Sequence, residues 1–143
     1  MSGRGAEKAP GGGGPRWVAT GVRLGGEFVI EDLVIPHVEE QIFPAITGTT
    51  EIKTLEAVGV IESLSIASLI EAADASTKEA SVQIIEIRLG SGIGGKSFVT
   101  LTGDVADVKA SIRSGVEAIK DSGNLVYFTV IPSPHKDFGQ LLL

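Results

Sequence analysis

Apolar residues between positions 53 and 138 follow two periods, and each period predicts one kind of element. Runs rich in apolar and β-branched residues, which are typical of strands, occupy residues 54–62, 81–88, 97–102 and 125–131. After the first and the third run, apolar residues recur every three or four positions, which is the spacing of an amphipathic helix. This order predicts an α+β fold: one four-stranded antiparallel sheet, two main helices on one face, and short terminal helices.

Both main helices have a capping residue at the position where their apolar pattern starts. Ser65 precedes the first helix and Asp104 the second, and both residue types are preferred at helix N-caps. The first helix runs to about residue 80 and the second to about residue 121. Asp74, Lys78 and Glu79 fall largely away from the apolar stripe of the first helix, so we expect them to face solvent.

The N-terminal part of the chain has a different character. Glycine, proline and charged residues dominate residues 1–16, and four successive glycines predict a flexible tail. Farther on, the run 28–35 is strand-like and ends at Pro36. A short helix is expected over about residues 37–44. The predicted organisation is a tail (1–16), an N-terminal extension (17–50) and one domain (51–143).

A short internal repeat connects the extension to the domain. Val34-Ile35-Pro36 resembles Val130-Ile131-Pro132, at an offset of 96 residues. Both follow an apolar run and precede a short helical tail. Since the offset is about the length of one domain, residues 28–46 are predicted to be the end of a preceding copy of the same domain, without its body.

Composition and charge exclude several kinds of function. The chain has 143 residues and a net charge of −6, and the residues after position 16 carry −8. So acidic a domain is a poor match for nucleic acid. No apolar run is long enough to cross a membrane. With no cysteine and two isolated histidines, the sequence offers no nucleophile–base pair, no metal-ligand pattern and no cofactor motif. We therefore expect no enzyme.

A glycine-rich loop separates the second and third predicted strands. Gly90, Gly95, Lys96 and Ser97 satisfy the phosphate-loop pattern G-x-x-x-x-G-K-[ST]. A phosphate loop requires a helix directly after its lysine, whereas residues 97–102 are strand-like. The first alternative is a hairpin loop whose glycines approach a symmetry axis and line a pore, with Lys96 favouring anions. The second is a surface loop without a function.

Four separated motifs resemble those of the bacterial microcompartment (BMC) shell domain. They are EAVGVIE (56–62), IEAADASTK (70–78), GDVADVK (103–109) and VIPSPH (130–135). The similarity covers about residues 53–138. Residues 28–52 and the loop 92–96 resemble the second half of the tandem, trimeric class of this family, found in propanediol-utilisation compartments.

The resemblance implies a structural protein. Members form flat hexagonal discs of six domains, which pack edge to edge into a shell around enzymes in the bacterial cytoplasm and pass small metabolites through a central pore. It implies a homohexamer, or a pseudohexamer completed by a partner chain, with other shell proteins and enclosed enzymes as partners. The implied pore-lining residues are Gly92, Ile93, Gly94, Gly95 and Lys96. The implied tile-edge residues are Lys78, Ser81, Ser133 and His135.

This chain departs from the family pattern at two edge positions. Ser133 stands where many members have arginine, and Ser81 replaces a common asparagine. Some tandem members hold an iron–sulfur cluster through cysteines, which this chain lacks. Two functions outside the family remain open from the residues alone: a small P-loop nucleotide-binding protein, and a ferredoxin-like ligand-binding or regulatory domain with the same element order.

Overall fold

Four antiparallel strands form one sheet in the computed structural model, which describes residues 15–90 and 96–138. The strands are β1 (Ala57–Ser63), β2 (Val82–Leu89), β3 (Ser97–Gly103) and β4 (Leu125–Ile131). Their order across the sheet is β2-β3-β1-β4. The predicted hairpin of the second and third strands is confirmed, since β2 and β3 pair antiparallel. Both central strands are the more buried ones, whereas β4 is an edge strand with exposed aromatic side chains.

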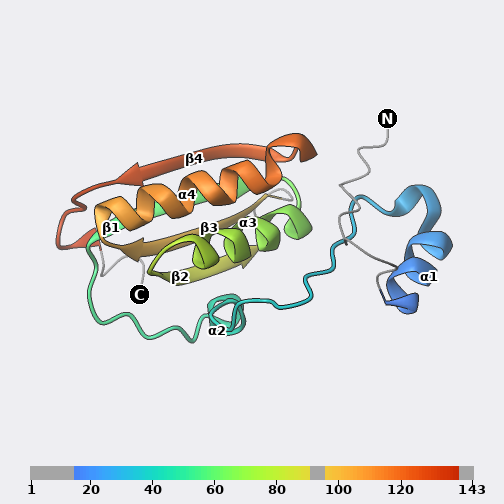
Figure 1. The fold of residues 1–143 in the computed structure, drawn as a ribbon, viewed down its shortest axis with the longest axis horizontal. Helices are drawn as coiled ribbons and strands as arrows, with labels where there is room; N and C mark the ends of the chain where they lie inside the picture. The colour runs from blue at the N-terminus through green and yellow to red at the C-terminus, as the bar shows by residue number, and fades with distance from the viewer. Residues whose placement is uncertain (1–14, 91–95, 139–143) are drawn as a thin grey trace.

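Two long helices, α3 (Ile66–Glu79) and α4 (Val105–Ile119), cover one face of the sheet (Figure 1). Both predicted caps are confirmed. Ser65 Oγ accepts a hydrogen bond from the backbone N–H of Ser68, and Asp104 Oδ1 accepts one from Ala106. A short 3-10 helix, η2 (Lys120–Ser122), links α4 to β4. The predicted α+β fold is therefore confirmed.

The hydrophobic core lies between this helical layer and the sheet. Its large, fully buried side chains come from three of the strands and both helices: Ile61, Leu69, Ile84, Val99, Leu101, Val108 and Ile119. Gly115 lies on α4 at the point where α4 crosses α3. A Cβ atom there would lie 2.7 Å from the carbonyl oxygen of Ala72 and would also collide with the Ser76 hydroxyl. Absence of a side chain at Gly115 therefore sets the distance between the two helices.

The N-terminal extension differs from the prediction. Residues 16–25 form a helix, α1 (Arg16–Gly25), followed by the 3-10 helix η1 (Gly26–Phe28), and neither was predicted. Residues 29–35 are not a strand. A strand requires a partner strand, whereas Glu31 in this segment bonds to Ser65 and Ser68 at the start of α3. Farther along the chain, Gln41 bonds to the edge of β2: its side chain donates to Val82 O and accepts from Ile84 N.

The short helix after Pro36 also begins later than predicted. Turns occupy the positions before it, and the helix α2 spans Ile42–Thr47 instead of about 37–44. Pro44 thus lies in the first turn, where its missing N–H costs nothing. Gly48, with φ +67°, ends the helix in the left-handed region. We call residues 29–47 the N-terminal strap, since they run along α3 and β2 of the domain (Figure 1).

Candidate functional site

The predicted pore loop and the predicted tile edge lie at opposite ends of the sheet. Val82 and Ala57 both pair with Gly103, and Ile131 pairs with the neighbouring Val58, so β2 begins where β4 ends. Ser81 precedes β2 and Ser133 follows β4, which places both at this end. The glycine loop connects Leu89 to Ser97 at the other end. Strands of seven or eight residues separate the two ends by roughly 20 Å.

The four edge residues do not form one cluster. Lys78 and Ser81 lie on the side of β2, whereas Ser133 and His135 follow β4, at the opposite lateral edge of the sheet. All four are exposed. His135 Nδ1 lies 3.4 Å from a carboxylate oxygen of Asp137, its only ionic neighbour among the described residues. The pair Lys78 and Ser81 therefore belongs to one surface of the domain, and the pair Ser133 and His135 to another. This is expected if each pair faces a different neighbouring domain.

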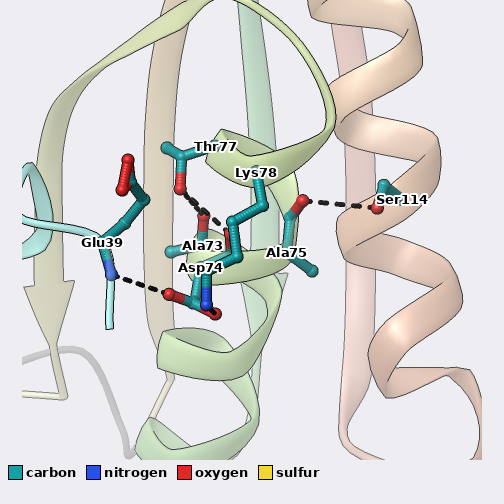
Figure 2. Close-up of polar contacts among 7 residues, drawn as sticks. All are labelled: Glu39, Ala73, Asp74, Ala75, Thr77, Lys78 and Ser114. Carbon is teal, nitrogen blue, oxygen red and sulfur yellow. Dashed lines mark hydrogen bonds and ion pairs between the residues drawn. The ribbon is translucent and has the colours of Figure 1, made fainter. Parts of the chain in front are cut away.

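Lys78 is held by the helix that carries it. Its Nζ lies 2.6 Å from Asp74 Oδ2, one turn earlier in α3, and its side chain is 45% exposed. Asp74 was expected to face solvent, and this expectation is wrong: the residue is 7% exposed. The strap covers it, and Asp74 Oδ1 accepts a 2.8 Å hydrogen bond from the backbone N–H of Glu39 (Figure 2). Lys78 thus projects beside a surface that the strap has already covered.

Both ends of the glycine loop, Gly90 and Lys96, lie among the described residues. Gly92, Ile93, Gly94 and Gly95 lie outside the described residues. Lys96 is exposed, and its Nζ lies 3.5 Å from Glu62 Oε1 on β1. Gly90 ends β2 with φ +65°, a left-handed turn that favours glycine. The charge of Lys96 is therefore partly balanced by Glu62, which the sequence analysis did not anticipate.

Ser97 is incompatible with the phosphate-loop interpretation. In that motif the serine begins a helix, whereas here it begins β3. The residue is fully buried, and its hydroxyl donates to Ser63 O and Ser65 O. A hydroxyl fixed in this way joins β3 to the start of α3. No group of three or more potential metal ligands occurs in the described ranges.

Sequence reasoning missed the residue that fastens the strap to the domain, Glu31. Its carboxylate accepts hydrogen bonds from the backbone N–H and the hydroxyl of Ser68, at 3.0 and 2.7 Å, and from the Ser65 hydroxyl. The Asn124 side chain donates to the same carboxylate at 3.4 Å. Glu31 thus caps the N-terminus of α3 from outside the helix, where a negative charge is favoured. The only local signal was the pair of serines in the first turn.

The strap is also fixed at its second half. Gln41 is bonded to β2, and the helix α2 that follows it buries two apolar side chains. These are Ile42 and Ala45, which are 2% and 1% exposed. Gln41 in effect supplies two of the bonds that another strand would make. The β2 edge is thereby covered, which also protects it from unspecific pairing.

We expect Glu31→Ala to lower the free energy of unfolding by about 1–2 kcal/mol, the usual cost of losing a helix cap with several hydrogen bonds. Urea denaturation measures this change. Glu27→Ala is the matched control, because Glu27 is exposed in η1. Equal stability of the two variants would contradict the capping role of Glu31.

A second carboxylate near Glu31 makes the stability depend on pH. Partial desolvation raises the pKa of Glu71 above its usual 4.5, and the negative charge of Glu31 raises it further. Because the folded-state pKa is the higher one, this group favours folding below pH 4.5 and the contribution is lost as the pH rises through the folded pKa. Glu71→Gln is expected to be slightly more stable than the parent at pH 7, with the difference disappearing as the pH falls. Urea titrations across this range measure it, and a variant less stable at pH 7 would contradict the assignment.

Comparison with known proteins assigns the fold to a family. A model described as "BMC domain" matches residues 57–134. The chain is 37% identical over 126 residues to the bacterial microcompartment shell protein PduT of Citrobacter freundii, which covers 88% of this chain and 68% of that protein. It is 39% identical over 88 residues to the shell protein EutM of Salmonella typhimurium, covering 61% of this chain and 88% of the relative.

A solved structure of a microcompartments protein from Desulfitobacterium hafniense DCB shares the fold. Its TM-score is 0.77 at 46% identity, and the match covers 86% of this chain and 68% of that chain. Together these findings define a microcompartment shell domain. The chain belongs to the BMC domain family. The predicted resemblance is thereby confirmed, and with it the role of a shell building block.

Proposed function

We propose that the chain is a structural tile that assembles into hexagonal discs with a central pore, and that these discs pack edge to edge in the shell of a compartment in the bacterial cytoplasm. The observation that carries this proposal is the placement of the glycine loop and the edge residues at opposite ends of one sheet. In a ring of such domains, one end can face the axis while the other faces the rim. The mechanism is assembly and passive passage of small metabolites, without bond chemistry.

The proposed rim consists of Lys78 and Ser81 on one side of each domain and Ser133 and His135 on the other. The proposed pore lining consists of Gly92, Ile93, Gly94, Gly95 and Lys96. A disc is built from six copies of this chain, or from this chain and a partner chain. Other shell proteins and enclosed enzymes are the further partners.

Electron microscopy of the concentrated full chain tests the proposal. We expect flat discs with a central depression that order into hexagonal sheets or closed particles. Particles without rotational symmetry, or filaments built from one lateral contact, would contradict a closed tile.

The Lys96–Glu62 pair provides a test of the pore. Glu62→Gln removes the carboxylate that balances the charge of Lys96. The permeability of the pore to anions relative to cations is therefore expected to rise about threefold. The effect is no larger because a partly exposed pair of charges contributes less than about 1 kcal/mol. The reversal potential across a planar bilayer that contains the discs measures this ratio. Glu86→Gln, which removes a partner of Arg88 on β2, is the control. An equal shift of the reversal potential in both variants would contradict a place for Lys96 in the pore lining.

A further inference from the structure

Asp74 on α3 is a buried carboxylate that contacts two different parts of the molecule. The residue is 7% exposed. Its Oδ1 accepts the hydrogen bond from the backbone N–H of Glu39 in the strap, and its Oδ2 lies 2.6 Å from Nζ of Lys78 (Figure 2). One side chain therefore connects the strap to the lysine at the proposed rim.

The burial of Asp74 distinguishes this ion pair from an ordinary pair on a helix surface. Two exposed side chains of opposite charge are mobile and hold each other only weakly. Here both carboxylate oxygens are engaged, so the carboxylate cannot turn without breaking one of the two contacts. A buried carboxylate that loses a partner is also costly. Lys78 thus has a fixed partner, although its side chain is 45% exposed.

The strap fixes its own side of this contact. Glu31 fastens the strap at the start of α3, and Gln41 fastens it at the edge of β2. Glu39 lies between these two anchors, only two residues before Gln41. Its backbone N–H is therefore a positioned donor, and the orientation of Asp74 depends on the strap.

A positioned lysine is better suited to a contact between discs than a mobile one. Lysine has a long and flexible side chain, and the entropy lost on ordering it opposes any contact that fixes it. An ammonium group has three N–H donors, so the pair with Asp74 leaves donors for a neighbouring disc. Identical discs that meet across a two-fold axis present the same charges to each other, and the charge of Asp74 offsets that of Lys78.

We infer that Asp74 positions Lys78 for the contact between discs, and that the strap is part of the tile edge because it fixes Asp74. This inference rests on the edge role of Lys78 in the proposed function. It adds to that role a second side chain and a condition: the lysine is held in its binding geometry only while the strap lies on α3.

The protein concentration at which sheets first form, followed by light scattering and electron microscopy, tests the inference. Asp74→Asn keeps an oxygen that accepts from the Glu39 N–H but removes the charge that holds Lys78. We expect discs of the parent's mass and a need for about threefold more protein to form sheets, an effect typical of a partly exposed ion pair. Hydrogen exchange at the Glu39 amide is expected to stay as slow as in the parent, which would show that the strap remains bound.

Glu79→Gln is the matched control. It removes one negative charge from the residue next to Lys78, which is exposed at the end of α3. We expect this variant to form sheets at the parent's concentration. A shift equal to that of Asp74→Asn would reduce the effect to net charge and overturn the inference.

Glu39→Pro tests the contribution of the strap. It removes the N–H donor and leaves both Asp74 and Lys78 in place. We expect sheets to require more protein here too. If this variant formed discs and sheets like the parent, the role of the strap would be wrong, and Asp74→Asn decides the role of Asp74 in either case.

The outcomes separate this inference from the proposed function. If Lys78→Ala lost sheet formation while Asp74→Asn formed sheets at the parent's concentration, the inference alone would be wrong. If the parent formed no sheets, or if Lys78→Ala formed them like the parent, the edge role of Lys78 would be wrong and the inference with it.

Discussion

Replacing Gly115 with alanine is expected to lower the free energy of unfolding by about 2–3 kcal/mol, the cost of overpacking at a tight contact. The added Cβ would lie 2.7 Å from Ala72 O and 2.8 Å from Ile61 Cδ1. One of these atoms belongs to the backbone of α3, so relief requires the two helices to move apart. Urea denaturation followed by circular dichroism measures the loss.

Gly21→Ala is the matched control for this result. It is the same substitution inside another helix, but the space around Gly21 is open in the isolated chain. We expect no loss of stability and a slight gain in helicity. If the two alanine variants were equally stable, the close approach of α3 and α4 would not depend on the missing side chain.

Replacing Lys78 with alanine is expected to abolish sheet formation at concentrations where the parent forms sheets, while leaving single discs intact. In the isolated chain the side chain is half-exposed and makes one ion pair within its own helix, so its removal costs less than about 0.5 kcal/mol in folding. The effect on assembly is therefore separable from an effect on folding. Electron microscopy counts sheets and discs, and light scattering reports the mass of the discs.

Lys120→Ala is the control for Lys78. Lys120 also pairs with a carboxylate on its own helical segment, Glu117, but lies at the other end of the sheet, near the start of β4. We expect this variant to form sheets like the parent. If the discs themselves fell apart in Lys78→Ala, the lysine would act at contacts within a disc and not between discs. If Lys78→Ala still formed sheets, the lysine would have no role at the tile edge.

The domain itself could be predicted from the sequence because its signals are local. The strands β1, β2 and β3 and the helices α3 and α4 all carry buried apolar residues, and their burial produces the apolar runs and periods seen in the sequence. Ser65 and Asp104 mark helix starts through contacts with residues two or three positions away. Four motifs in the correct order then identified the family.

The extension could not be predicted in the same way, since its conformation depends on distant partners. Residues 28–35 have the composition of a strand but no strand beside them in the described ranges. Phe28 therefore ends the 3-10 helix η1, and residues 29–35 form neither helix nor strand. Glu31 caps a helix that begins 35 positions later, and Asp74 is buried only because Glu39 lies over it. Such long-range contacts leave no periodicity in the sequence.

The tile-edge residues were assigned through the resemblance, and the structure adds to them a geometric relation. Lys78 and Ser81 lie on one lateral side of the sheet, Ser133 and His135 on the other, and the glycine loop at the far end. The spacing and composition of the sequence cannot predict these relative positions, because they depend on the order of the strands in the sheet. The pairing of Lys96 with Glu62 likewise depends on β1 and β3 being neighbours.

Mass in solution, measured by light scattering on the full chain, tests the central claim most directly. The account predicts a particle of six times the 14.8 kDa chain, which forms sheets or closed shells on concentration. Such a particle would make the glycine loop the lining of a pore. A stable monomer or dimer that forms no larger assembly would contradict a self-sufficient tile.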